Sequence, residues 1–134
     1  MSGTCGDELV ARDFELDDLV EVRHRVERWC AGNGLADQAL YWFVVAVNEI
    51  TTNAVRHGGG RGALRLWRTD NHVHCQVTDH GPGIPADQDG LVRPSPFQLG
   101  GRGLWLARQG CESVTLDAGA GGSTVTLTQP VPPS

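Results

Sequence analysis

One stretch of this chain decides its fold: Asn48-Glu49-Ile50-Thr51-Thr52-Asn53-Ala54-Val55-Arg56-His57-Gly58. It continues an apolar series at helical spacing: Leu40, Phe43, Val44, Val47, Ile50 and Ala54. We therefore expect one helix from near Asp37 to His57, ended by the glycines at 58–60. At about 100° per residue, its polar residues lie opposite the apolar stripe: Glu49, Asn53, Arg56 and His57. Glu49 and Asn53, four residues apart, then lie one above the other on one face of the helix.

The segments around this helix predict a sheet. Before it, Asp17 or Asp18 can cap a first helix that Gly32-Asn33-Gly34 ends. A short third helix is expected over 102–109. Alternating apolar residues and turn signals predict the strands 9–14, 63–68, 72–78, 114–116 and 124–128. This order indicates an α+β fold: a two-layer α/β sandwich with a mixed, mainly antiparallel sheet and helices on one face.

Length and composition exclude several classes of function. The 134 residues suit a single domain over 1–134, with loose ends at 1–8 and 130–134. The formal net charge of −5 argues against a general nucleic-acid binder. The sequence has no Lys, which excludes a P-loop and Schiff-base chemistry. A membrane-spanning stretch and a secretory signal are not expected, so we expect a cytoplasmic protein with reduced, mostly buried cysteines.

The polar residues of the quoted stretch suit a bound nucleotide. Asn53 offers an amide oxygen of the kind that Mg²⁺ accepts while keeping most of its water. Glu49 can polarise a hydroxyl or water near a terminal phosphate, and Arg56 can reach phosphate. Asp79 ends a strand, where its carboxylate can accept the amino group of adenine. These side chains point to a site for ATP with Mg²⁺.

Two glycine-rich segments add to this site. Gly81 and Gly83 let the backbone turn sharply and approach a flat ring. A long loop at 84–100 is typical of a functional lid, and the glycines that follow it at 100, 101 and 103 open a helix whose N–H groups favour phosphate. Arg102 is available for the terminal phosphate. Each segment alone is also compatible with plain turns, and His72 with His74 would hold a metal only if a third ligand joined them.

Together these segments resemble the GHKL (histidine kinase-like) ATPase superfamily. Glu49-Ile-Thr-Thr-Asn53-Ala is similar to its N-box, and Asp79-His-Gly81-Pro-Gly83-Ile84 to its first glycine box. Gly101-Arg102-Gly103-Leu104 is similar to the second, and Gly122-Ser123-Thr124-Val to the last, with Ser123 where Thr is usual. Within the superfamily the chain most resembles the bacterial anti-sigma-factor serine/threonine kinases, which are stand-alone domains of this length.

The resemblance implies a Bergerat ATP-binding fold with ATP and Mg²⁺ as cofactors. It implies Asn53 as the Mg²⁺ ligand, Glu49 as catalytic base and Asp79 as the adenine reader. It extends the expected nucleotide site to His57, Ile84, Leu104, Ser123 and Thr124. It further implies a homodimer that sequesters a sigma factor and phosphorylates an anti-anti-sigma (STAS-type) protein, with no direct contact with nucleic acid or membrane.

Two other functions remain open from the sequence. In the first, the domain binds ATP and changes its affinity for a protein partner without catalysis. In the second, the glycines only form turns and the chain binds no nucleotide. A binding measurement with ATP and Mg²⁺ separates these two.

Overall fold

The structure, a computed structural model, describes residues 8–57, 60–79, 111–119 and 122–131. Two helices and five strands lie in these ranges, with a short 3₁₀ turn before the first helix. The expected lid at 84–100 and the expected helix at 102–109 fall outside the described residues.

The helices form an antiparallel pair, α1 (Leu19–Gly32) and α2 (Asp37–His57). The 3₁₀ turn Leu16–Asp18 precedes α1, and the Asp18 carboxylate accepts the backbone N–H of Glu15 at 2.8 Å. Asp18 therefore caps this turn and makes no side-chain cap to α1, although it occupies the N-cap position that the sequence predicted. α2 begins and ends at the predicted residues.

The five strands form one sheet in the order β1-β2-β3-β5-β4. The sequence predicted a mixed, mainly antiparallel sheet. All pairs between the described strands are antiparallel. The strand bounds are β1 Leu9–Phe14, β2 Gly62–Thr69, β3 His72–Asp79, β4 Ser113–Gly119 and β5 Gly122–Pro130.

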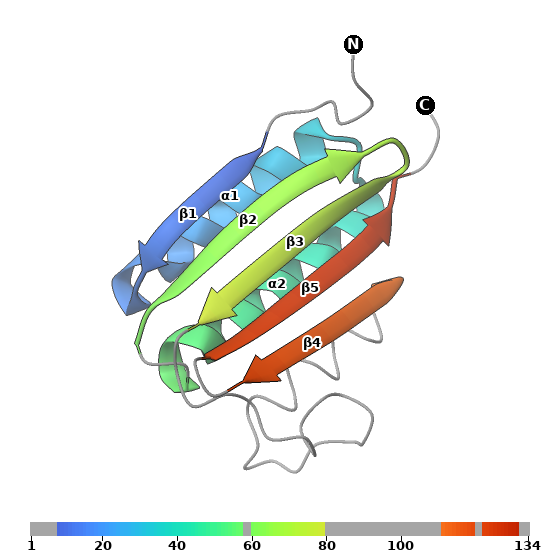
Figure 1. The fold of residues 1–134 in the computed structure, drawn as a ribbon. Helices are drawn as coiled ribbons and strands as arrows, with labels where there is room; N and C mark the ends of the chain where they lie inside the picture. Colours follow the sequence, from blue (N-terminus) through green and yellow to red (C-terminus); the bar gives the residue numbers. More distant parts are fainter. Residues whose placement is uncertain (1–7, 58–59, 80–110, 120–121, 132–134) are drawn as a thin grey trace.

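Helices cover one face of the sheet, as Figure 1 shows. α2 packs against the three central strands and α1 against β1. The core between the layers comes from alternate strand residues such as Leu64, Val73 and Leu127 and from the apolar stripe of α2, including Phe43 and Val47. The domain is therefore the two-layer α+β sandwich that the sequence predicted.

The C-terminal hairpin is longer than its sequence pattern indicated. β5 continues to Pro130, which pairs with His72, and the N–H of Val131 donates to the carbonyl oxygen of Asn71 at 2.8 Å. Val131 is buried and lies against Gly34. The prediction of a loose end from residue 130 is therefore wrong for Pro130 and Val131. Pro130 ends its strand, where its missing N–H costs little.

Candidate functional site

Three segments that the sequence singled out converge at one end of the domain. In Figure 1 the C-terminal end of α2, the arrowhead of β3 and the start of β5 all lie at this end. The antiparallel register explains the meeting, because Asp79 pairs with Gly62 at the start of β2 and Thr78 pairs with Thr124 near the start of β5. α2 packs over β3 in the same direction.

Two of the predicted ligands are buried polar side chains. Among the described residues, three polar or charged side chains are buried: Thr51, Asn53 and Asp79. Thr51 is a helix residue whose hydroxyl donates to the Val47 and Asn48 carbonyl oxygens at 2.9 and 3.0 Å. Asn53 and Asp79 are each 7 % exposed. Burial of an amide and a carboxylate costs free energy, so their placement requires polar partners at this end of the domain.

Asn53 and Asp79 lie at the same end of the domain. Asp79 continues the helix-facing side of β3, which Val73, Cys75 and Val77 occupy before it. A Cβ placed on Gly62, the cross-strand partner of Asp79, would lie 3.2 Å from the Cβ of Ala54. Ala54 therefore sits directly over the strand neighbour of Asp79. Asn53 precedes Ala54 in α2, so its backbone lies at the same end of the domain as Asp79.

The polar residues of α2 differ in exposure. Asn53, which the sequence places opposite the apolar stripe, is buried. Glu49, one turn earlier, is half-buried, and Arg56 is exposed. Four residues of helix span about 6 Å. Glu49 thus lies about one turn from Asn53 and is partly accessible to solvent.

Thr124 lies on the other face of the sheet. Its hydroxyl is 3.4 Å from that of Thr78, and both lie on the face without helices. The structure therefore does not bring the Thr124 hydroxyl together with Asn53 and Asp79. Ser123 is in β5 and His57 ends α2, so both have backbones at this end of the domain.

The remaining predicted site residues lie outside the described part of the chain: Gly81, Gly83, Ile84, Gly101, Arg102, Gly103 and Leu104. In the sequence these residues lie between β3, which ends at Asp79, and β4, which begins at Ser113. Gly62 was missed by the sequence reasoning. Its signal was a glycine at the first residue of a buried strand, which often marks close approach of another element.

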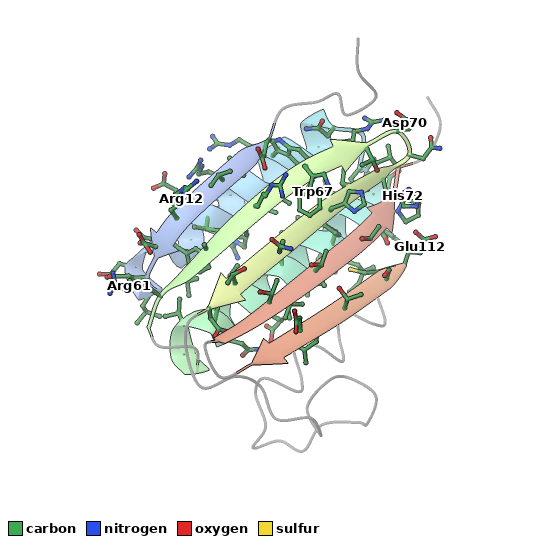
Figure 2. All side chains as sticks on the ribbon, viewed as in Figure 1. Arg12, Arg61, Trp67, Asp70, His72 and Glu112 are labelled. Atoms are coloured by element: carbon green, nitrogen blue, oxygen red, sulfur yellow. The ribbon has the colours of Figure 1, made fainter. Side chains whose placement is uncertain are left out.

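The two histidines on the open face of the sheet are engaged by protein groups. His74 contacts the Thr69 hydroxyl through Nε2 at 2.9 Å and the Thr128 hydroxyl through Nδ1 at 3.1 Å, and its ring stacks on Trp67. His72 contacts Glu112 at 2.9 Å, and both are labelled in Figure 2. No group of three metal-ligating side chains occurs among the described residues. These histidines belong to a polar surface network.

The cysteines of the described chain are free thiols. Cys30 and Cys75 are buried and Cys111 is half-buried, as the sequence analysis expected. Burial raises the pKa of Cys30 and Cys111 to about 12 and raises that of Cys75 well above its usual value. Such thiols are protonated at neutral pH and are not nucleophiles.

The side chains at this end of the domain are of types that can bind a nucleotide with a divalent cation. The donor set is an amide, a carboxylate and a half-buried second carboxylate at the end of a two-layer domain, and an amide oxygen is a ligand type that Mg²⁺ accepts. A carboxylate at a strand end can accept a hydrogen bond from an exocyclic amino group.

Two comparisons relate the sequence of this chain to known proteins. The family model of the histidine kinase-like ATPase domain matches residues 13–129. The signal transduction histidine-protein kinase AfsQ2 of Streptomyces coelicolor is 33% identical over 104 residues, which cover 67% of this chain and 19% of AfsQ2. The chain thus spans about a fifth of that relative's length.

Solved structures show the same fold. One is the structure of the RsbU and RsbW domains of Rv1364c from Mycobacterium tuberculosis, with a TM-score of 0.71 and 24% identity, covering 96% of this chain and 34% of that one. Another is the SiaB–SiaC complex from Pseudomonas aeruginosa, with a TM-score of 0.61 and 12% identity, covering 92% and 89%. Neither helix in the described part of this chain has the length and apolar character needed to cross a bilayer.

Proposed function

Because this chain belongs to the histidine kinase-like ATPase domain family, we propose that it binds Mg·ATP and transfers the γ-phosphoryl group to a serine or threonine of a partner protein. The observation that carries this proposal is the burial of Asn53 and Asp79 at one end of the domain. The third buried polar side chain of the described residues, Thr51, donates its hydroxyl to carbonyl oxygens of its own helix.

Each residue has a distinct part in the proposed reaction. The Asp79 carboxylate accepts a hydrogen bond from the adenine amino group and sets the orientation of the nucleotide. The Asn53 amide oxygen holds Mg²⁺, which would neutralise charge on the phosphate oxygens. Glu49 accepts the proton of the acceptor hydroxyl as its oxygen bonds to the γ-phosphorus and the bond to ADP breaks. The exposed Arg56 is one helical turn beyond Asn53 and would contact phosphate.

The proposed biological role is transcriptional control by partner switching. In this role the domain acts in the cytoplasm as a homodimer, sequesters a sigma factor and phosphorylates an anti-anti-sigma (STAS-type) protein. The structural likeness to the RsbW-containing protein of M. tuberculosis and to the SiaB–SiaC complex supports this choice at the level of the fold. The likeness to AfsQ2 makes a histidine acceptor the competing outcome.

The test combines nucleotide binding with phosphoryl transfer. The wild-type chain is titrated calorimetrically with Mg·ATP and then incubated with γ-labelled ATP and the purified STAS-domain proteins of the same genome. We expect ATP binding and acid-stable label on a STAS serine or threonine. Glu49→Gln should keep ATP binding and lose transfer by a factor of 100 or more, on the order of the general-base contribution.

A second pair of variants checks the nucleotide site itself. Asp79→Asn should weaken ATP binding roughly 10- to 100-fold, the size of a lost hydrogen bond to a charged group. Asp117→Asn, an exposed carboxylate on β4, is the matched control and should bind as wild type does. Equal ATP affinity in both variants would refute the site. ATP binding without transfer to any acceptor would leave a nucleotide-sensing adaptor.

A further inference from the structure

Two aromatic side chains stand exposed next to each other on α2. Tyr41 is 61% exposed and Trp42 is 41% exposed. Their rings meet edge to face with centroids 5.2 Å apart. Exposed tyrosine and tryptophan are typical of the centres of protein interfaces, where they contribute most of the binding energy. The expected nucleotide site does not account for this pair.

An apolar groove runs beside the aromatic pair. Its volume is about 330 Å³, and α2 supplies its apolar lining from Leu40, Tyr41, Val44 and Val45. α1 forms the other wall of the groove, because Glu27 also lines it. A groove of this kind between two helices accepts an apolar side chain of a partner segment.

Trp42 of the aromatic pair is in line with the candidate catalytic base. Trp42, Val45 and Glu49 are three and then four residues apart, so they share one stripe of the helix. The seven residues from Trp42 to Glu49 make two turns, or about 10 Å along the axis. Asn48, which also lines the groove, is the direct neighbour of Glu49. A protein segment seated on this part of α2 can therefore extend a hydroxyl to Glu49.

The charges around the groove define the chemistry of the occupant. Glu27 and Asp37 contribute two carboxylates, and Arg23 contributes one guanidinium. The chain as a whole carries a formal charge of −5. A segment with an apolar side chain next to a Lys or Arg complements this groove, whereas an anionic lipid surface or a nucleic acid does not.

We propose that Tyr41, Trp42 and the adjoining groove form the docking surface for the acceptor protein, which they hold so that its hydroxyl reaches Glu49. The occupant is the STAS-type acceptor, through a segment that bears an apolar side chain flanked by a basic residue. This inference rests on the proposed function and adds to it the surface that selects the substrate.

The experiment separates docking from nucleotide chemistry. The double variant Tyr41→Ala/Trp42→Ala is compared with wild type for three quantities: the Kd for Mg·ATP, the Kd for the purified STAS protein, and the KM and kcat of phosphoryl transfer. We expect the STAS Kd and KM to rise about tenfold or more, as for truncated hot spots, while the ATP Kd stays within twofold. Leu16→Ala is the matched control, because Leu16 is 58% exposed and lies before α1, away from the groove.

A charge variant tests the predicted complementarity. Glu27→Gln should weaken STAS binding at low salt, and the loss should shrink as the salt concentration rises. Unchanged STAS affinity in the aromatic double variant would overturn the proposal. Failure of the wild type to bind any STAS protein would do the same. If sedimentation shows that the double variant disrupts a dimer without altering STAS affinity, the surface joins two copies of this chain instead.

The outcomes also distinguish this inference from the proposed function. Glu49→Gln should abolish transfer and keep STAS affinity, whereas the aromatic variant should lose affinity and keep kcat at saturating acceptor. Binding of the STAS protein at the aromatic pair without any transfer would refute the kinase activity and leave the docking surface intact.

Discussion

At the scale of single residues, buried polar groups separate the candidate site from the rest of the domain. Asn53 and Asp79 are buried, and burial of an amide or a carboxylate is unfavourable unless hydrogen bonds compensate it. The polar network of the open face is different. His74, Thr69 and Thr128 contact one another there in partly exposed positions, where water competes for each hydrogen bond.

His74 gives the domain a pH-dependent stability. Its desolvation, and secondarily the nearby His72, lower the pKa of His74 below its usual value. The folded state then binds fewer protons than the unfolded state, so the contribution of His74 is present above about pH 6.5 and is lost as the pH falls through the folded pKa. We expect the urea midpoint to drop between pH 7.5 and pH 5.

His74→Gln should reduce this pH dependence, since glutamine cannot gain a proton. The measurement is urea unfolding followed by far-ultraviolet circular dichroism at both pH values. His24→Gln, at an exposed position of α1, serves as the control and should keep the wild-type slope. The explanation fails if His74→Gln and wild type lose the same free energy of unfolding on acidification.

At the scale of elements, Gly62 marks a close approach of α2 and of the Phe14 ring to β2. A Cβ on Gly62 would lie 2.8 Å from the Phe14 ring and 3.2 Å from the Cβ of Ala54. Real Cβ atoms do not approach ring carbons so closely, so the helix or the ring would have to move. Glycine at this position allows α2 to lie against the strand that pairs with Asp79.

Gly62→Ala should therefore destabilise the domain by about 1–3 kcal/mol, as overpacked core substitutions do. Gly32→Ala is the matched control. Gly32 ends α1 with open space around it, and alanine there should be neutral or slightly stabilising. Thermal and urea unfolding measure both variants. Equal stability of the two variants would show that the space around Gly62 relaxes without cost.

At the scale of the whole molecule, the site joins elements from distant parts of the chain. α2 supplies Glu49 and Asn53, and β3 supplies Asp79. A ligand that contacts both layers binds the folded state alone, so it stabilises the entire domain.

Mg·ATP at about 100 times its Kd should add roughly 2.7 kcal/mol to the free energy of unfolding and raise Tm by on the order of 5–10 °C. At the same ATP concentration, Asn53→Ala should show little of this increase in Tm. Gln38 is exposed on α2, so the control Gln38→Ala should show the full increase. Differential scanning calorimetry with and without Mg·ATP provides the comparison. A full increase in Asn53→Ala would place the nucleotide elsewhere.

The sequence by itself determined the elements and the identity of the polar residues. Periodicity gave α2 its bounds at Asp37 and His57, because a helix stripe and a following glycine run are local signals. Alternation gave the five strands, and the motif spacing selected Glu49, Asn53 and Asp79. The short patterns at 114–116 and 124–128 underestimated β4 and β5, since strand length depends on the partner strand and only weakly on local composition.

The tertiary structure alone decided which face each side chain occupies. It buried Asn53, which helix periodicity places opposite the apolar stripe, and it put the Thr124 hydroxyl on the face opposite Asp79. It also left Tyr41 and Trp42 exposed beside a groove. The physical reason is that burial depends on how layers and strands pair across long separations in the chain, and no local spacing encodes that pairing.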